Sequence, residues 1–185
     1  MIRNLKYAVV VLMLSIACAG AHMQTTERGL PQEYFPLKTG LYWKYRYQGL
    51  PRGPVDVEVR VEEQKEINGK QYYRLSTWFT LTRNVPSGET WVSWSDGNVY
   101  LSDGKSENVV IGPGIEKTEL KKNDPSAPVE TPAGKFDDVL KFQDCLGCAD
   151  SGTQYSLARG KGTVLVTMSA IWGSAQYELI ETNAP

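Results

Sequence analysis

One stretch of the sequence alternates strictly between apolar and charged residues. Every second residue from Val55 to Val61 is a valine, and each residue between them is charged. Successive side chains of a β-strand point to opposite faces, so this spacing places the valines on one face and the charges on the other. A helix would scatter the same valines around its axis. The stretch therefore predicts a half-buried β-strand.

The same period of two recurs along the chain. Leu41, Trp43, Tyr45 and Tyr47 occupy alternate positions of one run. Further strands are expected in the runs 70–82, 89–95, 98–102, 107–112, 136–143, 152–160, 163–170 and 175–182. Asn68-Gly69, Asp96-Gly97 and Asp103-Gly104 supply the positive φ angles that tight hairpin turns need.

These runs favour a chain built from strands alone. No segment keeps an apolar period of 3.6 residues over ten residues, and residues 112–128 suit a loop with one short extended piece. About ten strands at short spacing predict an all-β fold. We expect a single antiparallel meander sheet, strongly curved, as an open barrel or a sandwich.

The N-terminus has the pattern of an export signal. Arg3 and Lys6 precede the apolar run 7–17, which has the length of a signal-peptide core and is too short to span a bilayer. We expect residues 1–21 to be a signal peptide, residues 22–35 a polar tether and residues 36–185 a β-domain. No later run is apolar enough for a membrane helix.

Two cleavage patterns overlap behind that core. Residues 19–21 are small and suit the general signal peptidase, with cleavage before His22. Residues 14–18 resemble the lipobox of bacterial lipoproteins, although Ser15 stands where an aliphatic residue is usual. That resemblance implies acylation of Cys18, and several acyl chains would anchor the protein durably. If Cys18 is acylated, the expected location is the outer membrane. If the leader is simply cleaved before His22, the expected location is the periplasm or the exterior of the cell.

Several chemistries lack the residues they need. The single histidine, His22, lies at the cleavage region, so histidine-dependent nucleophilic catalysis has no base. Zinc would find too few ligands, and no phosphate-binding loop motif is present. The leader carries two of the 20 basic residues and none of the 21 acidic ones, which leaves a mildly acidic mature chain. We therefore expect no enzyme activity, no metal, no cofactor and no nucleic-acid partner.

Adjacent acidic residues do not change this expectation. Glu62 and Glu63, like Asp137 and Asp138, are neighbours on expected strands. Neighbouring strand residues point to opposite faces, so we expect each pair to be separated and solvated.

Cys145 and Cys148 are the two thiols that both cleavage patterns leave available for redox chemistry. In an oxidising compartment we expect them to form a disulfide within a hairpin. A redox-active CxxC site and free thiols remain as alternatives. The redox reading lacks the helix that activates the first cysteine in such sites.

Aromatic residues are abundant, with five tryptophans and ten tyrosines. They could fill the hollow of a curved sheet, or they could line a cavity for an apolar ligand. The candidate ligand-binding residues are Trp43, Tyr45, Trp78, Trp91 and Trp94.

Two motifs carry a family resemblance. The run YFPLKTGLYWKY at residues 34–45 and the run TPAGKF at residues 131–136 resemble signatures of a group of uncharacterised exported bacterial proteins and lipoproteins. The resemblance implies no chemistry, because no role is attached to that group. At the level of fold, such domains are similar to periplasmic carriers of lipoproteins and lipids.

The function expected from these features is binding. We expect a non-catalytic interaction module of the cell envelope, which recruits a partner protein through an exposed sheet edge. The alternative is a carrier of lipid or another apolar ligand inside the curved sheet.

Overall fold

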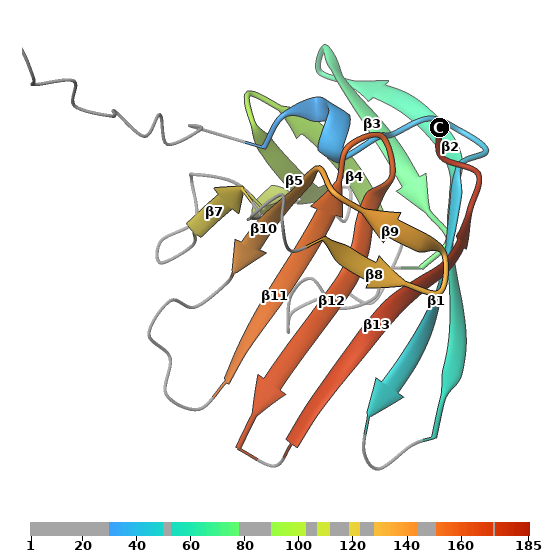
Figure 1. The fold of residues 1–185 in the computed structure, drawn as a ribbon. Coiled ribbons are helices and arrows are strands. Elements are labelled where there is room, and N and C mark those ends of the chain that lie inside the picture. Colours follow the sequence, from blue (N-terminus) through green and yellow to red (C-terminus); the bar gives the residue numbers. More distant parts are fainter. Residues whose placement is uncertain are drawn as a thin grey trace, which may run out of the picture.

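The chain folds almost entirely into β-strands (Figure 1). The computed structural model describes residues 30–49, 53–77, 90–102, 107–111, 119–122, 128–143, 151–171 and 173–185. A single 3₁₀ turn, η1 (Gln32–Tyr34), precedes the strands in this part of the chain. The strands are β1 (Tyr42–Gly49), β2 (Val55–Ile67), β3 (Lys70–Leu75), β4 (Thr90–Ser95), β5 (Asn98–Ser102), β6 (Glu107–Ile111), β7 (Glu119–Lys122), β8 (Val129–Thr131), β9 (Gly134–Phe136), β10 (Val139–Gln143), β11 (Ser151–Ala158), β12 (Gly162–Ala170) and β13 (Gly173–Thr182).

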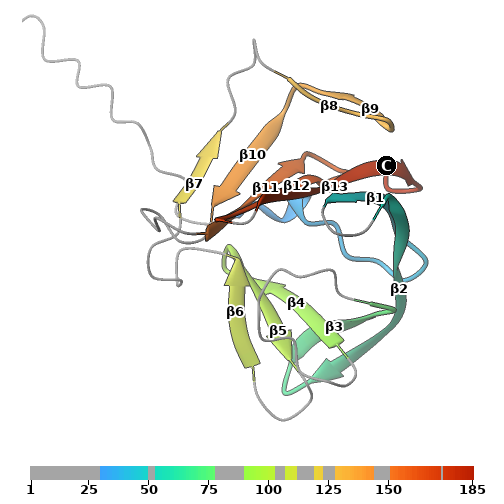
Figure 2. The ribbon, with the colours of Figure 1, turned by 90° about the horizontal axis from the view of Figure 1, so that it is seen from below.

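Eleven of these strands form one antiparallel sheet, in the order β6-β5-β4-β3-β2-β1-β13-β12-β11-β10-β7. Most neighbours in the sheet are also neighbours in sequence, which confirms the predicted all-β meander. The sheet curves back on itself, so that β3 to β6 face β1 and β10 to β13 across a core (Figure 2). Strands β6 and β7 lie at the two ends of the order. The sheet is therefore open rather than a closed barrel.

Strand β2 connects the two layers. Its first half pairs with β1 and its second half pairs with β3, with a β-bulge between Val61 and Glu63. A bulge bends a strand and increases its twist. In β2 this bend turns the sheet from one layer into the other (Figure 2).

Two of the predicted hairpin turns have the expected backbone. Asn68 and Gly69 have φ angles of 53° and 76°, and Asp96 and Gly97 have φ angles of 52° and 76°. Two successive positive φ values are the mark of a type I′ turn, which matches the twist of antiparallel strands. The third predicted turn, at residues 103–104, lies outside the described residues.

The core lies between the two layers. The side chains that are at most 2% exposed include aromatic and aliphatic residues from both layers: Tyr34, Tyr45, Tyr155, Phe142, Leu30, Leu140, Leu157, Leu179, Val61, Val92 and Val99. Leu30, Tyr34 and Phe35 belong to this core, although the sequence analysis assigned them to the tether. Burial of these three large apolar side chains stabilises the fold. The packed domain therefore includes residues 30–35.

One predicted strand is interrupted. Residues 136–143 were expected to be continuous, but β9 ends at Phe136 and β10 begins at Val139. Asp138 lies between the two strands, and its carboxylate accepts hydrogen bonds from Tyr34 and Arg159. Strands β8 and β9 form a separate two-stranded sheet that contacts β12 and β13 (Figure 2). The short extended piece expected within residues 112–128 is β7.

No helix among the described ranges is long and apolar enough to cross a membrane.

Candidate functional site

Three of the five candidate aromatic residues are parts of the core. Trp43 is 7% exposed and Tyr45 is 2% exposed, and Trp94 packs against the same cluster. Each also donates a hydrogen bond to a main-chain carbonyl: Trp43 Nε1 to Lys161 (2.5 Å), Tyr45 Oη to Thr163 (2.8 Å) and Trp94 Nε1 to Leu30 (2.8 Å). A buried indole or phenol needs such a partner. These three rings support the filled-hollow interpretation rather than a ligand cavity.

Trp91 lies on the opposite face of the sheet from Trp94. It sits between Arg74 and Ser102 on neighbouring strands and is 3% exposed, but it does not belong to the core cluster. The ammonium group of Lys65 lies 3.6 Å from the centre of its ring. The candidates therefore do not converge on one site, and Trp78 lies outside the described residues.

A polar cluster occupies the same outer face beside Trp91. Lys70 Nζ lies 2.6 Å from Glu107 Oε1 and 3.3 Å from the ring centre of Tyr100, and Tyr72 donates a hydrogen bond to Glu107. Burial would raise the pKa of Glu107, but hydrogen bonds from Lys70 and Tyr72 lower it overall. Burial and the neighbouring carboxylate raise the pKa of Tyr72 to about 12. The polar groups of the cluster thus pair with one another, and Lys65 and Lys70 cover the aromatic rings on this face of the sheet.

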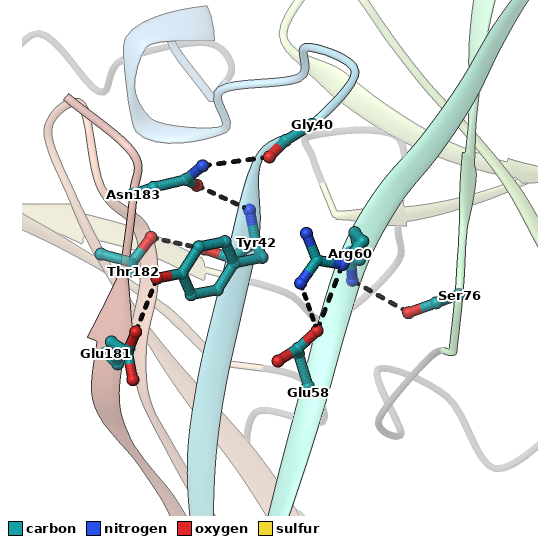
Figure 3. A network of polar contacts seen from close by, with 8 residues as sticks. All are labelled: Gly40, Tyr42, Glu58, Arg60, Ser76, Glu181, Thr182 and Asn183. Carbon is teal, nitrogen blue, oxygen red and sulfur yellow. Dashed lines mark hydrogen bonds and ion pairs between the residues drawn. The ribbon is translucent and has the colours of Figure 1, made fainter.

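A second polar network joins the start of β1 to the end of β13 (Figure 3). Asn183 accepts a hydrogen bond from the amide of Tyr42 and donates one to the carbonyl of Gly40. The hydroxyl of Tyr42 donates a hydrogen bond to Glu181. Arg60 and Glu58, which both lie on the neighbouring strand β2, pair with each other. These contacts attach the C-terminal segment to the sheet, which is a structural role.

A third network holds the N-terminal turn. Arg159 binds Asp138 (2.6 Å) and Glu33 (2.5 Å), and Tyr34 donates to Asp138 (2.5 Å). The hydrogen bond to Asp138 is the main reason why the pKa of Arg159 is raised. Burial and Asp138 raise the pKa of Tyr34 to about 12. The guanidinium thus links η1 to the β9–β10 and β11–β12 connections.

The expectation that Glu62 and Glu63 are separated was wrong, whereas both side chains are exposed to solvent as expected. Both carboxylates reach Arg74, at 3.4 Å and 3.2 Å. The β-bulge at this point breaks the strict alternation of faces. The guanidinium of Arg74 compensates the two charges. No group of three or more His, Cys, Asp or Glu residues within the described ranges is placed to hold a metal ion.

The open end of the long strands differs from all of these clusters. There the chain turns from β1 into β2 and from β12 into β13 (Figure 1). Val55 is 48% exposed and Ile171 is 70% exposed, and they are the two exposed large hydrophobic residues of the described chain. Both lie at this end, at the beginning of β2 and just after β12.

The inner face of the sheet continues toward these two residues. Tyr47 pairs with Val55 on one side and with Tyr177 on the other, and the two tyrosine rings are 5.0 Å apart. Met168 and Ala175 form the next row. All of these side chains are partly or largely exposed, whereas the preceding rows at Tyr45 and Val59 are buried. We call these residues (Tyr47, Val55, Met168, Ala175, Tyr177 and Ile171) the apolar end.

Gly49 allows the rings to lie down at the apolar end. A Cβ atom placed on Gly49 would lie 2.5 Å from the Cβ of Ala175 and 2.6 Å from the hydroxyl of Tyr47. Two non-bonded atoms cannot approach so closely, so a larger residue at position 49 would push the ring of Tyr47 or Ala175 aside. The lack of a side chain at position 49 therefore allows the ring of Tyr47 to lie where it does.

A shallow groove occupies the outer face of the same strands. It has a volume of about 530 Å³ and is lined by Gln48, Gly49, Pro54, Thr167, Ser174, Ala175 and Gln176. Gln48 and Gln176 pair across β1 and β13, and Thr167 pairs with Gln176 from β12. The two faces of one sheet end thus differ, with apolar side chains inside and amides and hydroxyls outside.

Sequence reasoning missed the apolar end because alternation alone does not say how far a stripe is covered. The valines from Val55 to Val61 form a uniform pattern, yet their exposure falls from 48% to 1% along the strand. The lengths of the expected strands gave no signal of this, since the run 70–82 was expected to be longer than the runs 163–170 and 175–182. Cys18, Cys145 and Cys148 lie outside the described residues.

Comparison with known proteins gives two distant structural likenesses. No protein-family model matches the sequence, and no curated protein matches it. A candidate lipoprotein from Parabacteroides distasonis is similar over 81% of this chain and 98% of its own, with 13% identity and a TM-score of 0.43. A candidate exported protein with a YmcC-like fold from Bacteroides fragilis is similar over 80% and 98%, with 13% identity and a TM-score of 0.46. Neither likeness is close enough to carry a family or a function to this chain.

Proposed function

We propose that this protein is an exported, non-catalytic interaction module that binds an apolar segment of a partner protein at its apolar end. The observation that carries the proposal is the exposure of Val55 and Ile171, the two exposed large hydrophobic residues among those the structure describes, at the end of the sheet where Tyr47 and Tyr177 are also partly exposed. Exposed apolar groups that gather at one place mark interaction sites, whereas scattered ones do not.

The depth of the apolar end favours a protein segment over a lipid. The inner face is filled as far as Tyr45, whose hydroxyl is bound to the carbonyl of Thr163. A ligand at the apolar end can therefore lie only on the surface beyond this row. A carried lipid needs a site that encloses most of its surface, whereas the apolar side chains of a partner segment need only cover exposed groups such as Val55 and Ile171.

The location is proposed from the N-terminal sequence. Arg3, Lys6 and the apolar run 7–17 form an export leader, followed either by Cys18 as a lipidation site or by cleavage before His22. A partner in the cell envelope is consistent with both routes.

A photocrosslinking experiment tests the proposal. A photoreactive amino acid replaces Val55 in the full-length protein within its native cell envelope, and in a matched control it replaces Glu58, on the outer face of the same strand. The expected result is a protein adduct from position 55 that is absent from position 58 and is lost when Ile171→Asp is added. The proposal would be overturned by adducts that consist of lipid, by equal adducts from both positions, or by no adduct.

A further inference from the structure

The groove on the outer face is built from uncharged polar side chains on interior strands. Gln48, Gln176 and Thr167 form a row across β1, β13 and β12, with Ser174 two residues from Gln176. At this row β13 and β12 are paired on both sides, and β1 is paired with β13, whereas the pairing of β1 with β2 ends at Tyr47. The backbone groups of Gln176 and Thr167 are thus engaged in the sheet, and these two residues offer a ligand only their side chains.

Glu178 holds the two amides of the groove in place. Its carboxylate accepts a hydrogen bond from Gln48 Nε2 at 2.7 Å and another from Gln176 Nε2 at 3.0 Å. The carbonyl oxygen of each amide is on the branch away from this bond, and it can accept a hydrogen bond from a ligand. A binding site whose polar groups are already fixed loses less entropy on binding.

Charged side chains lie beside the groove rather than in its lining. The hydrogen bond and the charge of Asp56, with a smaller contribution from Glu178, raise the pKa of Arg46. The guanidinium binds the carboxylate of Asp56 at 3.0 Å, whereas Glu178, across β1 and β13 from Arg46, binds the two glutamine amides. All seven residues that line the groove are uncharged. This arrangement offers no charge of its own to select an anion or a cation.

The strand pairing limits one mode of peptide recognition. A peptide that extends a sheet needs an unpaired edge strand, and β12 and β13 are paired on both sides at the groove, whereas the pairing of β1 with β2 ends at Tyr47. Amide oxygens and hydroxyls of fixed position suit a ligand that carries many hydroxyl groups. The volume of about 530 Å³ lies in the range of small-molecule sites.

We propose that the groove formed by Gln48, Thr167, Ser174 and Gln176 is a binding site for a neutral carbohydrate chain. The hydroxyls of the sugar donate to the amide oxygens of Gln48 and Gln176 and accept from Thr167 and Ser174. These four polar side chains lie on the face opposite the apolar end, although the groove is also lined by Ala175, which belongs to that end. They can bind a sugar without the apolar side chains that the proposed partner protein would cover.

Nuclear magnetic resonance of the full mature protein tests this site. The side-chain amide signals of Gln48 and Gln176 are followed while maltotriose, cellotriose or chitotriose is added. We expect saturable shifts of both signals with at least one of these neutral trisaccharides. A Gln48→Ala, Gln176→Ala double variant should weaken binding at least about tenfold, because two hydrogen bonds are lost.

A matched pair of variants tests the role of Glu178. Glu178→Gln removes the charge that fixes both amides and should also weaken binding of the trisaccharide. Glu181→Gln makes the same change on the same strand, outside the groove, and should leave binding unchanged. The proposal is overturned if none of the three trisaccharides gives a saturable shift, or if Glu181→Gln weakens binding as much as Glu178→Gln.

A peptide control separates the two faces. An apolar tripeptide of valines should leave the amide signals of Gln48 and Gln176 in place. If it shifts them while the trisaccharides do not, the groove belongs to peptide recognition and the carbohydrate assignment fails. The crosslinking result at Val55 is independent of either outcome.

Discussion

Tyr47 and Tyr177 face each other across β1 and β13, with their ring centres 5.0 Å apart, and this pair separates the filled core from the apolar end. On one side of the pair, Tyr45 and Leu179 are buried. On the other side, the sheet continues with Gly49, which has no side chain, and Ala175, whose methyl group is too small to cover the face. A single sheet thus provides both a stable core and an accessible surface.

Substitutions of two glycines near the β1–β2 connection should have different effects on stability. A methyl group on Gly49 would meet Ala175 and Tyr47, whereas a methyl group on Gly53 would meet nothing within 4 Å. Gly49→Ala should lower the free energy of unfolding by about 1–3 kcal/mol, the usual cost of overpacking. Gly53→Ala should change it by less than about 0.5 kcal/mol. Urea unfolding of both variants makes the comparison, and equal effects would contradict the close approach of Tyr47 to Gly49.

Two valines of one stripe should differ in the same way. Val55 and Val61 lie on the same face of β2 but are 48% and 1% exposed. Threonine has nearly the same shape as valine, but its hydroxyl is costly to bury without a partner. Val61→Thr should lower the free energy of unfolding by about 1–3 kcal/mol, and Val55→Thr should leave it within about 0.5 kcal/mol. If chemical unfolding shows a large loss for Val55→Thr, that residue is covered and the apolar end is not open.

Alkaline pH should destabilise the protein through Tyr72. Its pKa is raised to about 12 in the folded state, against about 10 in an unfolded chain. A raised pKa means that the folded state holds the proton more tightly, so this contribution is complete below about pH 10 and is lost as the pH rises toward 12. The hydroxyl of Tyr72 donates a hydrogen bond to Glu107, which is also paired with Lys70.

The measurement compares the slope of stability against pH for the wild type and Tyr72→Phe. Urea midpoints between about pH 10 and 12 should fall less steeply for the variant, which has no proton to lose at that position. Tyr47→Phe is the control, because it removes a tyrosine hydroxyl at the apolar end and leaves the Glu107 cluster intact. Identical slopes for the wild type and Tyr72→Phe would show that this hydroxyl does not contribute.

Much of the fold follows from local chemistry that a sequence displays. Alternation placed β1 and β2, and Asn68-Gly69 and Asp96-Gly97 formed their turns, because a strand pattern and a positive φ are decided by neighbouring residues. The break at Asp138 could not be foreseen in this way. It depends on Arg159 and Tyr34, which are distant in sequence.

The candidate site was harder to predict than the fold. Trp91 and Trp94 are three residues apart, so they must lie on opposite faces of a strand, yet both were grouped as lining one cavity. In the structure, the indole of Trp94 donates a hydrogen bond to the carbonyl of Leu30, a residue that the sequence analysis assigned to the tether. Which aromatic ring is buried in the core and which is accessible depends on how the sheet folds over itself. A bulge in β2 controls that folding, and the alternating pattern continues through it without a visible break.

Removal of one buried hydroxyl should make the protein more stable. Ser93 is fully buried on the outer face of β4, opposite Tyr100, and its Oγ has no hydrogen-bond partner. A buried hydroxyl without a partner costs free energy, since it gives up its bonds to water and gains none. Ser93→Ala should therefore raise the free energy of unfolding by about 1 kcal/mol. Ser76→Ala is the control, because the Oγ of Ser76 accepts a hydrogen bond from the amide of Arg60 at 2.9 Å. Loss of this hydroxyl should lower stability or leave it unchanged. Calorimetric unfolding of both variants decides the matter: a loss of stability in Ser93→Ala would mean that its hydroxyl is bonded in solution, and that the lysines over this face leave room for water.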